Sequence, residues 1–497
     1  MAAALCEAGD ADGMNFQLFD FQRENVQSIR DRYRSGDGAV LYQLSTGGGK
    51  TYTFCYIAES AAKLGNRVWI LVHRQELIRQ TSESLRVIGV HHGIIAPGYT
   101  PDPLASIQVC SVQTLVRRLG KLLPPHLIIV DECHHTIAAT YAKILAFYHQ
   151  AKVLGVTATP CRMDGRGLGR HCGGHYDSMV NGPPFSELVA MKRLCMPRIF
   201  APPIGVDFGG LHKRYGDFIK DEVSAAMDKP VITGCAVEHY KRISPNEPTI
   251  AFCASVAHAE NVAEEFRRKG FQAASIDGKM DDVSRKRRIS DLGNGGLHVL
   301  TSCDIVSEGT DIPLVSTAIL LRPSASLSMV LQQIGRAARV SDGKTHFNVI
   351  DHVANTERHE LQGLGRPEWD ITWSLDGEVK KKKSASSSGP GFRQCMSCYS
   401  VHAPAPRCPA CGHVYEVNAR ELDQVDGHLR EIDPATLERL QKIETDRERW
   451  SRVREEQSCK TYQDFAALAK KRGYAQSWAG IRWGQKKKRA AATLPGV

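Results

Sequence analysis

The segment LSTGGGKT, residues 44 to 51, follows the apolar run AVLYQL and precedes the helical pattern YTFCYIAESAAKL. Successive glycines let the backbone curl so that amide N–H groups point at phosphate oxygens, helped by the positive end of the next helix. A lysine at this position reaches the β and γ phosphates, and the next hydroxyl binds Mg²⁺. Leu44 replaces the first glycine of the general pattern, and a flexible turn is the alternative. The residues expected to contact the nucleotide are Thr46, Gly47, Gly48, Gly49, Lys50 and Thr51.

Short β-branched runs alternate with longer helical patterns around this loop. The alternation extends from residue 39 to 157 and again from 249 to 351, which predicts two α/β lobes with parallel sheets. A Lys, Ser and Gly mixture then predicts a linker. The expected domains are lobe one at 14–200, a connection at 201–228, lobe two at 229–357, a linker at 358–390, a cysteine module at 391–416 and a helical basic region at 417–497.

The charge and hydropathy of the chain limit its partners. A formal net charge of +10 with a pI near 8.9 favours a polyanion, although ordinary solvated lysines are the alternative for any one basic run. No apolar run approaches the roughly 20 residues of a membrane span, so no membrane partner is expected. The first residues lack the basic segment and apolar core of a secretion signal, which predicts a cytoplasmic location.

The stretch LIIVDECHH, residues 127 to 135, ends a second apolar strand in two carboxylates. Beside a phosphate loop, Asp131 can hold the Mg²⁺ shell while Glu132 orients and deprotonates the attacking water. Zinc binding by this stretch is the alternative, since thiol and imidazole groups follow directly. Neighbouring residues at a strand end point to opposite sides, however, which disfavours a single metal centre.

Several motifs in order resemble the DExH type of superfamily 2 helicases, over roughly Phe16 to Asp351. They are FDFQRE, STGGGKT, LVHRQELIRQ, CSVQTL, DECHH, TATP, IAFCASVAHAE, TSCDIVSEGTDIP and QQIGRAAR. The resemblance implies two tandem RecA-like lobes that hydrolyse ATP between them. Arginines from one lobe can fork onto phosphate oxygens held by the other, so hydrolysis is expected to require that the cleft closes.

The resemblance also implies roles for single residues. Gln22 would read adenine and Asp311 would lie near the ribose, while Phe19 stands where relatives often carry a stacking arginine. Residues that would complete hydrolysis from lobe two are Gln332, Arg336 and Arg339, and residues that would couple it to motion are His134, Thr157 and Thr159. Expected nucleic-acid contacts are His73, Arg74, Gln113, Ser255 and Thr301, each of which could instead be a satisfied polar residue at a strand end.

Four cysteines, Cys395, Cys398, Cys408 and Cys411, form two C-x₂-C pairs separated by nine residues. Each pair can present two thiolates to one tetrahedral ion, which predicts a structural zinc ribbon, with iron as the chemical alternative. A second group, Cys161, His171, Cys172 and His175, has irregular spacing and is expected to be scattered structural residues. Aromatic residues near the C-terminus predict a miniature helical core.

The zinc ribbon after a DExH motor, TATP in motif III and the basic tail together resemble RadD-like bacterial and phage DNA helicases. The resemblance implies an ATP-dependent DNA helicase or translocase in replication, recombination or repair, with ATP, Mg²⁺ and structural Zn²⁺ as cofactors. Single-stranded or branched DNA is the expected partner, with replication or recombination proteins as further candidates. The alternatives are an RNA helicase, a duplex translocase without strand separation, and a non-motor DNA-binding adaptor with an ATP switch.

Overall fold

The computed structural model describes residues 17–162, 165–201, 212–214, 217–219, 222–223, 230–303, 315–377, 393–395, 400–402, 405–414, 459, 461–472 and 477–484. The chain divides into two compact units, residues 1–416 and 417–497. The first unit contains two α/β lobes and the cysteine module. The second unit contains the C-terminal helices.

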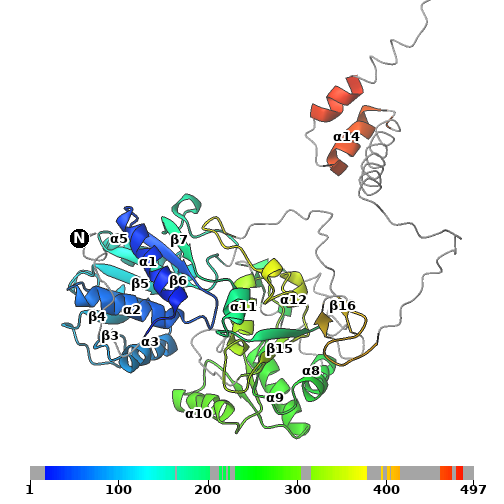
Figure 1. Cartoon of the computed structure of the whole chain (residues 1–497), viewed down its shortest axis with the longest axis horizontal. Helices are drawn as coiled ribbons and strands as arrows, with labels where there is room; N and C mark the ends of the chain where they lie inside the picture. The colour runs from blue at the N-terminus through cyan, green and yellow to red at the C-terminus, as the bar shows by residue number, and fades with distance from the viewer. Residues whose placement is uncertain are drawn as a thin grey trace, which may run out of the picture. The chain divides into compact units, whose positions relative to one another are not determined.

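The first lobe is built on a seven-stranded sheet in the order β3-β4-β2-β5-β6-β1-β7, and all its strand pairs are parallel. Figure 1 shows it in blue and cyan. Its elements are α1 (Asp20–Arg34), β1 (Ala39–Gln43), α2 (Lys50–Lys63), β2 (Val68–Val72), α3 (Gln75–Val87), β3 (Gly93–Ile95), β4 (Ile107–Ser111), α4 (Val112–Leu115), β5 (Leu127–Asp131), η1 (Cys133–His135), α5 (Ala139–Phe147), β6 (Lys152–Thr157), η2 (Arg170–Cys172), β7 (Ser178–Asn181) and α6 (Phe185–Ala190).

The second lobe is built on a six-stranded parallel sheet in the order β12-β13-β11-β14-β15-β8. Its elements are β8 (Met196–Phe200), β9 (Lys213–Arg214), β10 (Asp217–Phe218), α8 (Pro230–Ile243), β11 (Thr249–Cys253), α9 (Val256–Arg268), β12 (Ala273–Ile276), α10 (Asp282–Gly293), β13 (Val299–Ser302), β14 (Thr317–Leu321), α11 (Leu327–Ala337), β15 (His346–Asp351), α12 (Asn355–Arg358) and η3 (Pro367–Trp369). The prediction of two parallel α/β lobes is therefore confirmed.

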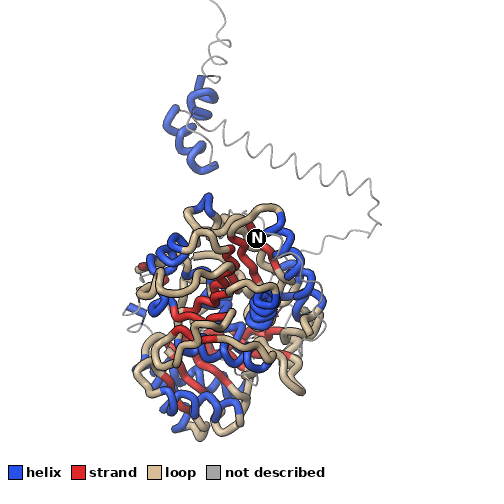
Figure 2. Tube along the Cα trace, turned by 90° about the vertical axis from the view of Figure 1, so that its left-hand side faces the viewer, coloured by secondary structure: helices blue, strands red, loops and turns tan. Residues whose placement is uncertain are grey.

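The central strands of both sheets are continuous apolar runs because helices cover them. All five residues of β2, β5 and β11 are buried, as expected for parallel sheets between helical layers. Figure 2 shows the strands in the interior of the two lobes and the helices outside them. The carboxyl ends of such strands carry the loops in which α/β proteins bind ligands.

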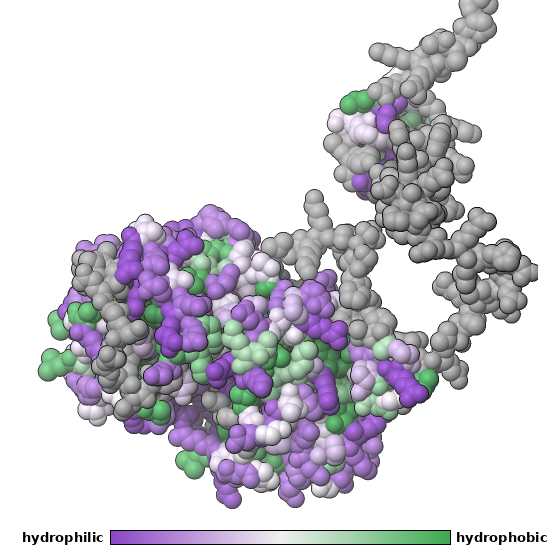
Figure 3. Space-filling view, in the orientation of Figure 1, coloured by the Kyte–Doolittle hydropathy of each residue, from purple (hydrophilic) through white to green (hydrophobic). Residues whose placement is uncertain are grey.

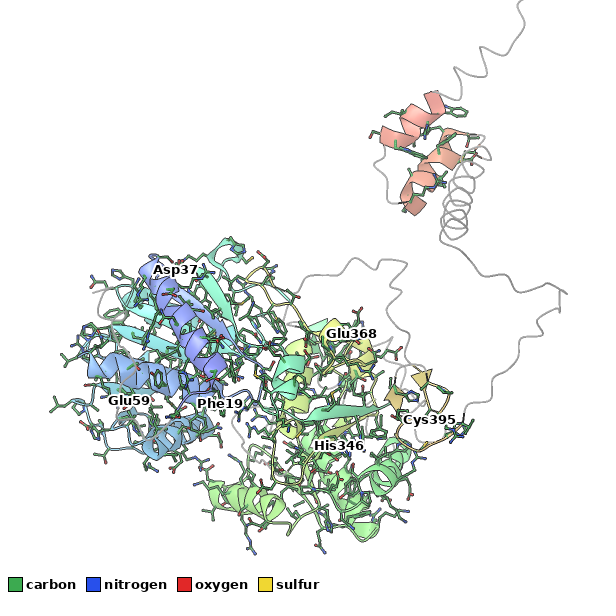
Figure 4. All side chains as sticks on the ribbon, viewed as in Figure 1. Phe19, Asp37, Glu59, His346, Glu368 and Cys395 are labelled. Atoms are coloured by element: carbon green, nitrogen blue, oxygen red, sulfur yellow. The ribbon has the colours of Figure 1, made fainter. Side chains whose placement is uncertain are left out.

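The predicted boundary between the lobes at residue 200 is wrong for one strand. Strand β8 pairs in parallel with β15 from Met196 to Phe200, so it belongs to the second sheet. The short cysteine module, with β16 (Arg393–Gln394) and β17 (Val401–His402), continues from this edge through a bridge between Phe200 and Ser400. Figure 4 places Cys395 beside the second lobe. It places Phe19 on the side of the first lobe that faces the second lobe.

The second unit contains α14 (Tyr462–Arg472) and a further helical stretch at 477–484. Phe465, Leu468 and Ala469 are buried together, and Trp478 and Trp483 pack against them, as the sequence predicts for a miniature core. In the described part of the chain, no helix is both long and apolar enough to cross a membrane. Figure 3 shows hydrophilic residues over most of the visible face of the two lobes, with apolar residues scattered among them.

Candidate active site

The phosphate loop joins β1 to α2, and two of its glycines adopt backbone angles that other residues rarely take. Gly47 has a φ of 85° and Gly49 a φ of 91°, both in the left-handed region. A Cβ at Gly49 would lie only 2.7 Å from Nε2 of Gln22. Lys50 begins α2, and its Nζ donates to the Leu44 carbonyl at 3.1 Å. The Lys50 ammonium group therefore lies against the loop, where it would also contact a bound phosphate.

The two carboxylates at the end of β5 form a hydrogen-bonded group with motif III. Glu132 has a φ of 49°, which is unusual for a residue with a side chain and is often found at functional sites. Its backbone N–H donates to Oδ1 of Asp131 at 3.0 Å, and its Oε2 accepts from Oγ1 of Thr157 at 3.3 Å. His134 Nδ1 lies 3.2 Å from the same hydroxyl. Residues 25 positions apart in sequence are thus linked directly at the strand ends.

The charges at this point suit a bound cation. Burial, and then the neighbouring Glu132, raise the pKa of Asp131 to about 7, while Lys50 opposes the rise. Burial also lowers the pKa of Lys50, against the pull of the two carboxylates. A divalent cation would favour the charged form of Asp131. Carboxylate and hydroxyl oxygens are the donors that Mg²⁺ prefers, so the residues present fit this ion.

The second lobe brings α11 against the phosphate loop. Gln332 and Arg336 are buried on this helix. The positive charges of Arg336 and Arg339 both lower the pKa of Lys50, so all three cations act on one place. Helix α11 and the phosphate loop pack closely at Gly335. A Cβ added to this glycine would lie only 2.6 Å from Cβ of Thr46. The structure therefore brings the predicted lysine, carboxylates and arginines together across the two lobes.

Two further residues, Thr159 and Lys344, hold the segment that carries Arg336 and Arg339 in place. Thr159 Oγ1 of motif III contacts the Ser328 hydroxyl at the start of α11. Behind the helix, Lys344 Nζ donates to the carbonyls of Ala337 at 2.5 Å and of Arg339 at 2.7 Å. Burial lowers the pKa of this lysine to about 8. Sequence reasoning missed Lys344, since its partners are main-chain atoms that leave no motif.

The predicted adenine-reading residue lies next to the phosphate loop. Gln22 is buried; its Oε1 accepts from the N–H of Phe19 at 3.0 Å and its Nε2 donates to the Gly49 carbonyl at 3.3 Å. Each amide atom keeps one further hydrogen-bonding position. The exposed Phe19 ring carries the guanidinium of Arg193 at 3.5 Å from its centroid. Sequence reasoning missed Arg193, which lies 174 positions after Phe19 and has no motif of its own.

The five expected nucleic-acid contacts do not share one environment. His73, Arg74, Gln113 and Ser255 are at least partly exposed, and Ser255 caps α9 by accepting from the His258 N–H. Thr301 is fully buried in β13 and donates to the Ala259 carbonyl at 2.7 Å. The prediction for Thr301 is wrong. Its hydroxyl is buried and bonded to a helix carbonyl, so the side chain cannot contact a bound nucleic-acid strand.

Three of the four predicted metal-binding cysteines converge. The sulfur atoms of Cys395, Cys408 and Cys411 all lie within 4.8 Å of one another. The backbone N–H of Cys408 donates to the His413 carbonyl, and Gly412 turns with a φ of 72°, an arrangement that suits a metal-binding turn. Cys398 and the predicted ribose contact Asp311 lie outside the described residues.

Comparison with known proteins gives consistent matches to the two lobes. Residues 15–162 match the family model of the type III restriction enzyme res subunit, and residues 234–341 match the helicase conserved C-terminal domain. A "51.5 kDa protein" of Lactococcus phage (isolate 7-9) is 32% identical over 381 residues, which cover 76% of this chain and 79% of the phage protein.

A yeast protein and a solved structure extend this comparison. The putative ATP-dependent helicase IRC3 of Saccharomyces cerevisiae is 30% identical over 359 residues, which cover 68% of this chain. The matched residues span about half (51%) of the yeast protein. The fragment structure of a putative HsdR subunit of a type I restriction enzyme from Vibrio vulnificus YJ016 has a TM-score of 0.54 at 21% identity. The match covers 70% of this chain and 67% of that one, and it supports the fold.

Proposed function

We propose that this chain couples ATP hydrolysis to movement along DNA or to the unwinding of DNA. The chain belongs to the superfamily 2 helicases and is an ATP-hydrolysing enzyme. The observation that carries the proposal is the contact of α11 with the phosphate loop and motif III, which places the charges of Arg336 and Arg339 where they act on Lys50. A site assembled from two lobes is complete only when they close. Cycles of closing and release can therefore become movement on a bound strand.

Within this site we assign the phosphate contacts to Lys50 and the loop amides. Thr51 and Asp131 would hold Mg²⁺, which would supply positive charge beside the β and γ phosphates. Glu132 orients the attacking water and accepts its proton, as its position beside Asp131 and Thr157 supports. Gln332 and the two arginines act on the transferring phosphoryl group from the other lobe.

Support for DNA comes from the match of the first lobe to a restriction enzyme subunit and from the basic charge of the chain. Single-stranded or branched DNA is the substrate that we propose. RNA is the first alternative, because the motor chemistry is shared. A duplex translocase that never separates strands would need the same site, whereas a non-motor adaptor would not need Glu132 or the arginine pair.

The test is to measure ATP hydrolysis by the wild type and by Lys50→Ala with single-stranded DNA, duplex DNA, forked DNA and RNA, followed by strand displacement. Stimulation by single-stranded or forked DNA is expected. Stimulation by RNA alone would exclude the DNA assignment, and no stimulation by any nucleic acid would exclude a motor. Stimulation by duplex DNA without displacement would indicate the translocase.

We expect Arg193→Ala to weaken nucleotide binding. The guanidinium lies over the Phe19 ring, and both groups border the place where Gln22 would read the base. Loss of the cation–π partner should raise KM for ATP about threefold to tenfold, which corresponds to roughly 1 kcal/mol, while kcat changes little. Steady-state ATPase assays would measure the effect, with the neighbouring Lys192→Ala as the control. Equal KM values for the two variants would argue against a role of Arg193 at the base.

We also propose that the cysteine module holds a structural zinc ion. The three converging sulfurs support this, as does a module too small to fold around an apolar core. Cys408→Ser should release one zinc ion per chain, measured by elemental analysis, and leave basal ATP hydrolysis within about twofold, because the module lies at the β8 edge of the second lobe. Loss of basal hydrolysis together with the zinc would instead make the module part of the motor.

A further inference from the structure

Residues 370–377, which we call the strap, follow the second lobe and return to the first. Asp370 accepts from the N–H of Ser186 at 3.1 Å, and the Trp373 carbonyl accepts from Nδ2 of Asn181 at 3.4 Å. Further along, the Leu375 carbonyl accepts from the Gly169 N–H at 3.1 Å. The strap is therefore held along the loop, β7 and the start of α6, which follow motif III of the first lobe.

At its end the strap completes a group of three different metal-binding side chains. His171 Nε2 lies 2.6 Å from Oδ1 of Asp376, and the donor atoms of His171, Cys172 and Asp376 all lie within 4.8 Å of one another. The sequence predicted scattered structural residues here; in the structure His171 and Cys172 converge with Asp376, while Cys161 is buried at a bridge to Gly167. The sequence does not reveal Asp376, which is 204 positions from Cys172.

The backbone around these side chains is fixed on both sides. Arg162 Nη2 donates to the Cys172 carbonyl at 2.8 Å, which ties the short turn η2 to the residue just after motif III. A Cβ at Gly169 would lie 2.4 Å from the His171 ring, so the glycine makes room for the imidazole. On the strap, Oδ2 of Asp376 accepts from the Ser374 hydroxyl at 3.1 Å. Such outer hydrogen bonds orient metal ligands.

We propose that His171, Cys172 and Asp376 bind one zinc ion that fastens the strap to the first lobe. Imidazole, thiolate and carboxylate are the three donor types that Zn²⁺ accepts, and three protein ligands leave a fourth position for water. Bond lengths near 2.0 to 2.3 Å place ligand atoms roughly 3 to 4 Å apart. The three side chains are exposed or half-buried, so they reach this spacing by small rotations.

Zinc at this place joins the segment after the second lobe to the loop after motif III. Motif III itself contacts α11 through Thr159 and Ser328. A fastened strap therefore restrains separation of the lobes along a second line of contact. This consequence rests on the proposed motor function, whereas the zinc site itself does not.

The test compares zinc bound per full-length chain in the wild type and in Asp376→Asn. The amide keeps the size of the side chain and a hydrogen bond to His171, yet it is a poor zinc ligand. We expect Asp376→Asn and His171→Ala each to bind one zinc ion fewer than the wild type, and the exposed His149→Ala to bind as many. Equal zinc content in the wild type and Asp376→Asn would overturn the proposal. Because the measured quantity is a difference, it depends neither on the cysteine module nor on ATP hydrolysis.

Hydrogen exchange gives a second readout. Zinc should slow exchange of the Gly169 amide, which donates to the Leu375 carbonyl, by about tenfold in the wild type and leave it unchanged in Asp376→Asn. Equal slowing in both proteins would show that zinc does not fasten the strap through Asp376.

Discussion

Glu132→Gln should reduce the rate of ATP hydrolysis by about three orders of magnitude and leave ATP bound at least as tightly as in the wild type. General-base catalysis contributes about 10² to 10⁴ to a rate, and an amide cannot accept the proton of the attacking water. The glutamine keeps the shape of the side chain and can still accept from Thr157. Removing a negative charge beside Asp131 also reduces repulsion toward the triphosphate.

Single-turnover hydrolysis and equilibrium binding of a fluorescent ATP analogue would separate the two effects. Glu59→Gln is the matched control, since Glu59 lies on α2 and pairs only with the half-exposed Lys63 among the ion pairs of the described residues. Hydrolysis by Glu132→Gln within tenfold of the wild type would remove Glu132 from the role of general base. Loss of ATP binding would instead mean that the carboxylate supports the fold of the site.

The parts of the site that the sequence predicted are those with local geometry. The phosphate loop and the carboxylates at the end of β5 each depend on one strand and the turn after it, so their spacing is readable. The pairing of β8 with β15 joins residues about 150 apart, and register over such a separation leaves no local pattern. Arg193 and Asp376 were missed for the same reason, as each acts on a partner distant in the sequence, whereas Lys344 was missed because it bonds to main-chain carbonyls only a few positions away, which leave no motif.

Thr301 shows how a motif can mislead when its strand lies in the interior. The residue begins the motif TSCDIVSEGTDIP near a strand end, where a polar side chain suggests a ligand contact. In the structure β13 lies between β11 and β12, and the Thr301 hydroxyl satisfies its hydrogen bond within the lobe. Buried polar groups normally find such partners. Alternation along the strand alone did not reveal which face α9 would cover.

Arg339→Ala should also reduce hydrolysis by about three orders of magnitude, and the loss should be greatest when a nucleic acid stimulates the wild type. Burial lowers the pKa of Arg339 to about 10, so the guanidinium still carries its charge at neutral pH. An arginine supplied from another lobe contributes about 10³ to 10⁵ to phosphoryl transfer. The Arg339 backbone is fixed by Lys344 and by a bridge to Leu194. The residue therefore loses little conformational entropy when it binds the transition state.

A lysine at this position tests the geometry separately from the charge. Arg339→Lys keeps a cation but loses the planar fork, so we expect it to recover less than a tenth of wild-type activity. Arg268→Ala, on the exposed face of α9, is the control and should hydrolyse ATP normally. Nucleotide binding by Arg339→Ala should change little, because the residue acts mainly on the transition state. If Arg339→Ala lost ATP binding but kept kcat, Arg339 would be shown to hold ATP in the ground state. Other contacts would then have to drive the closing of the lobes.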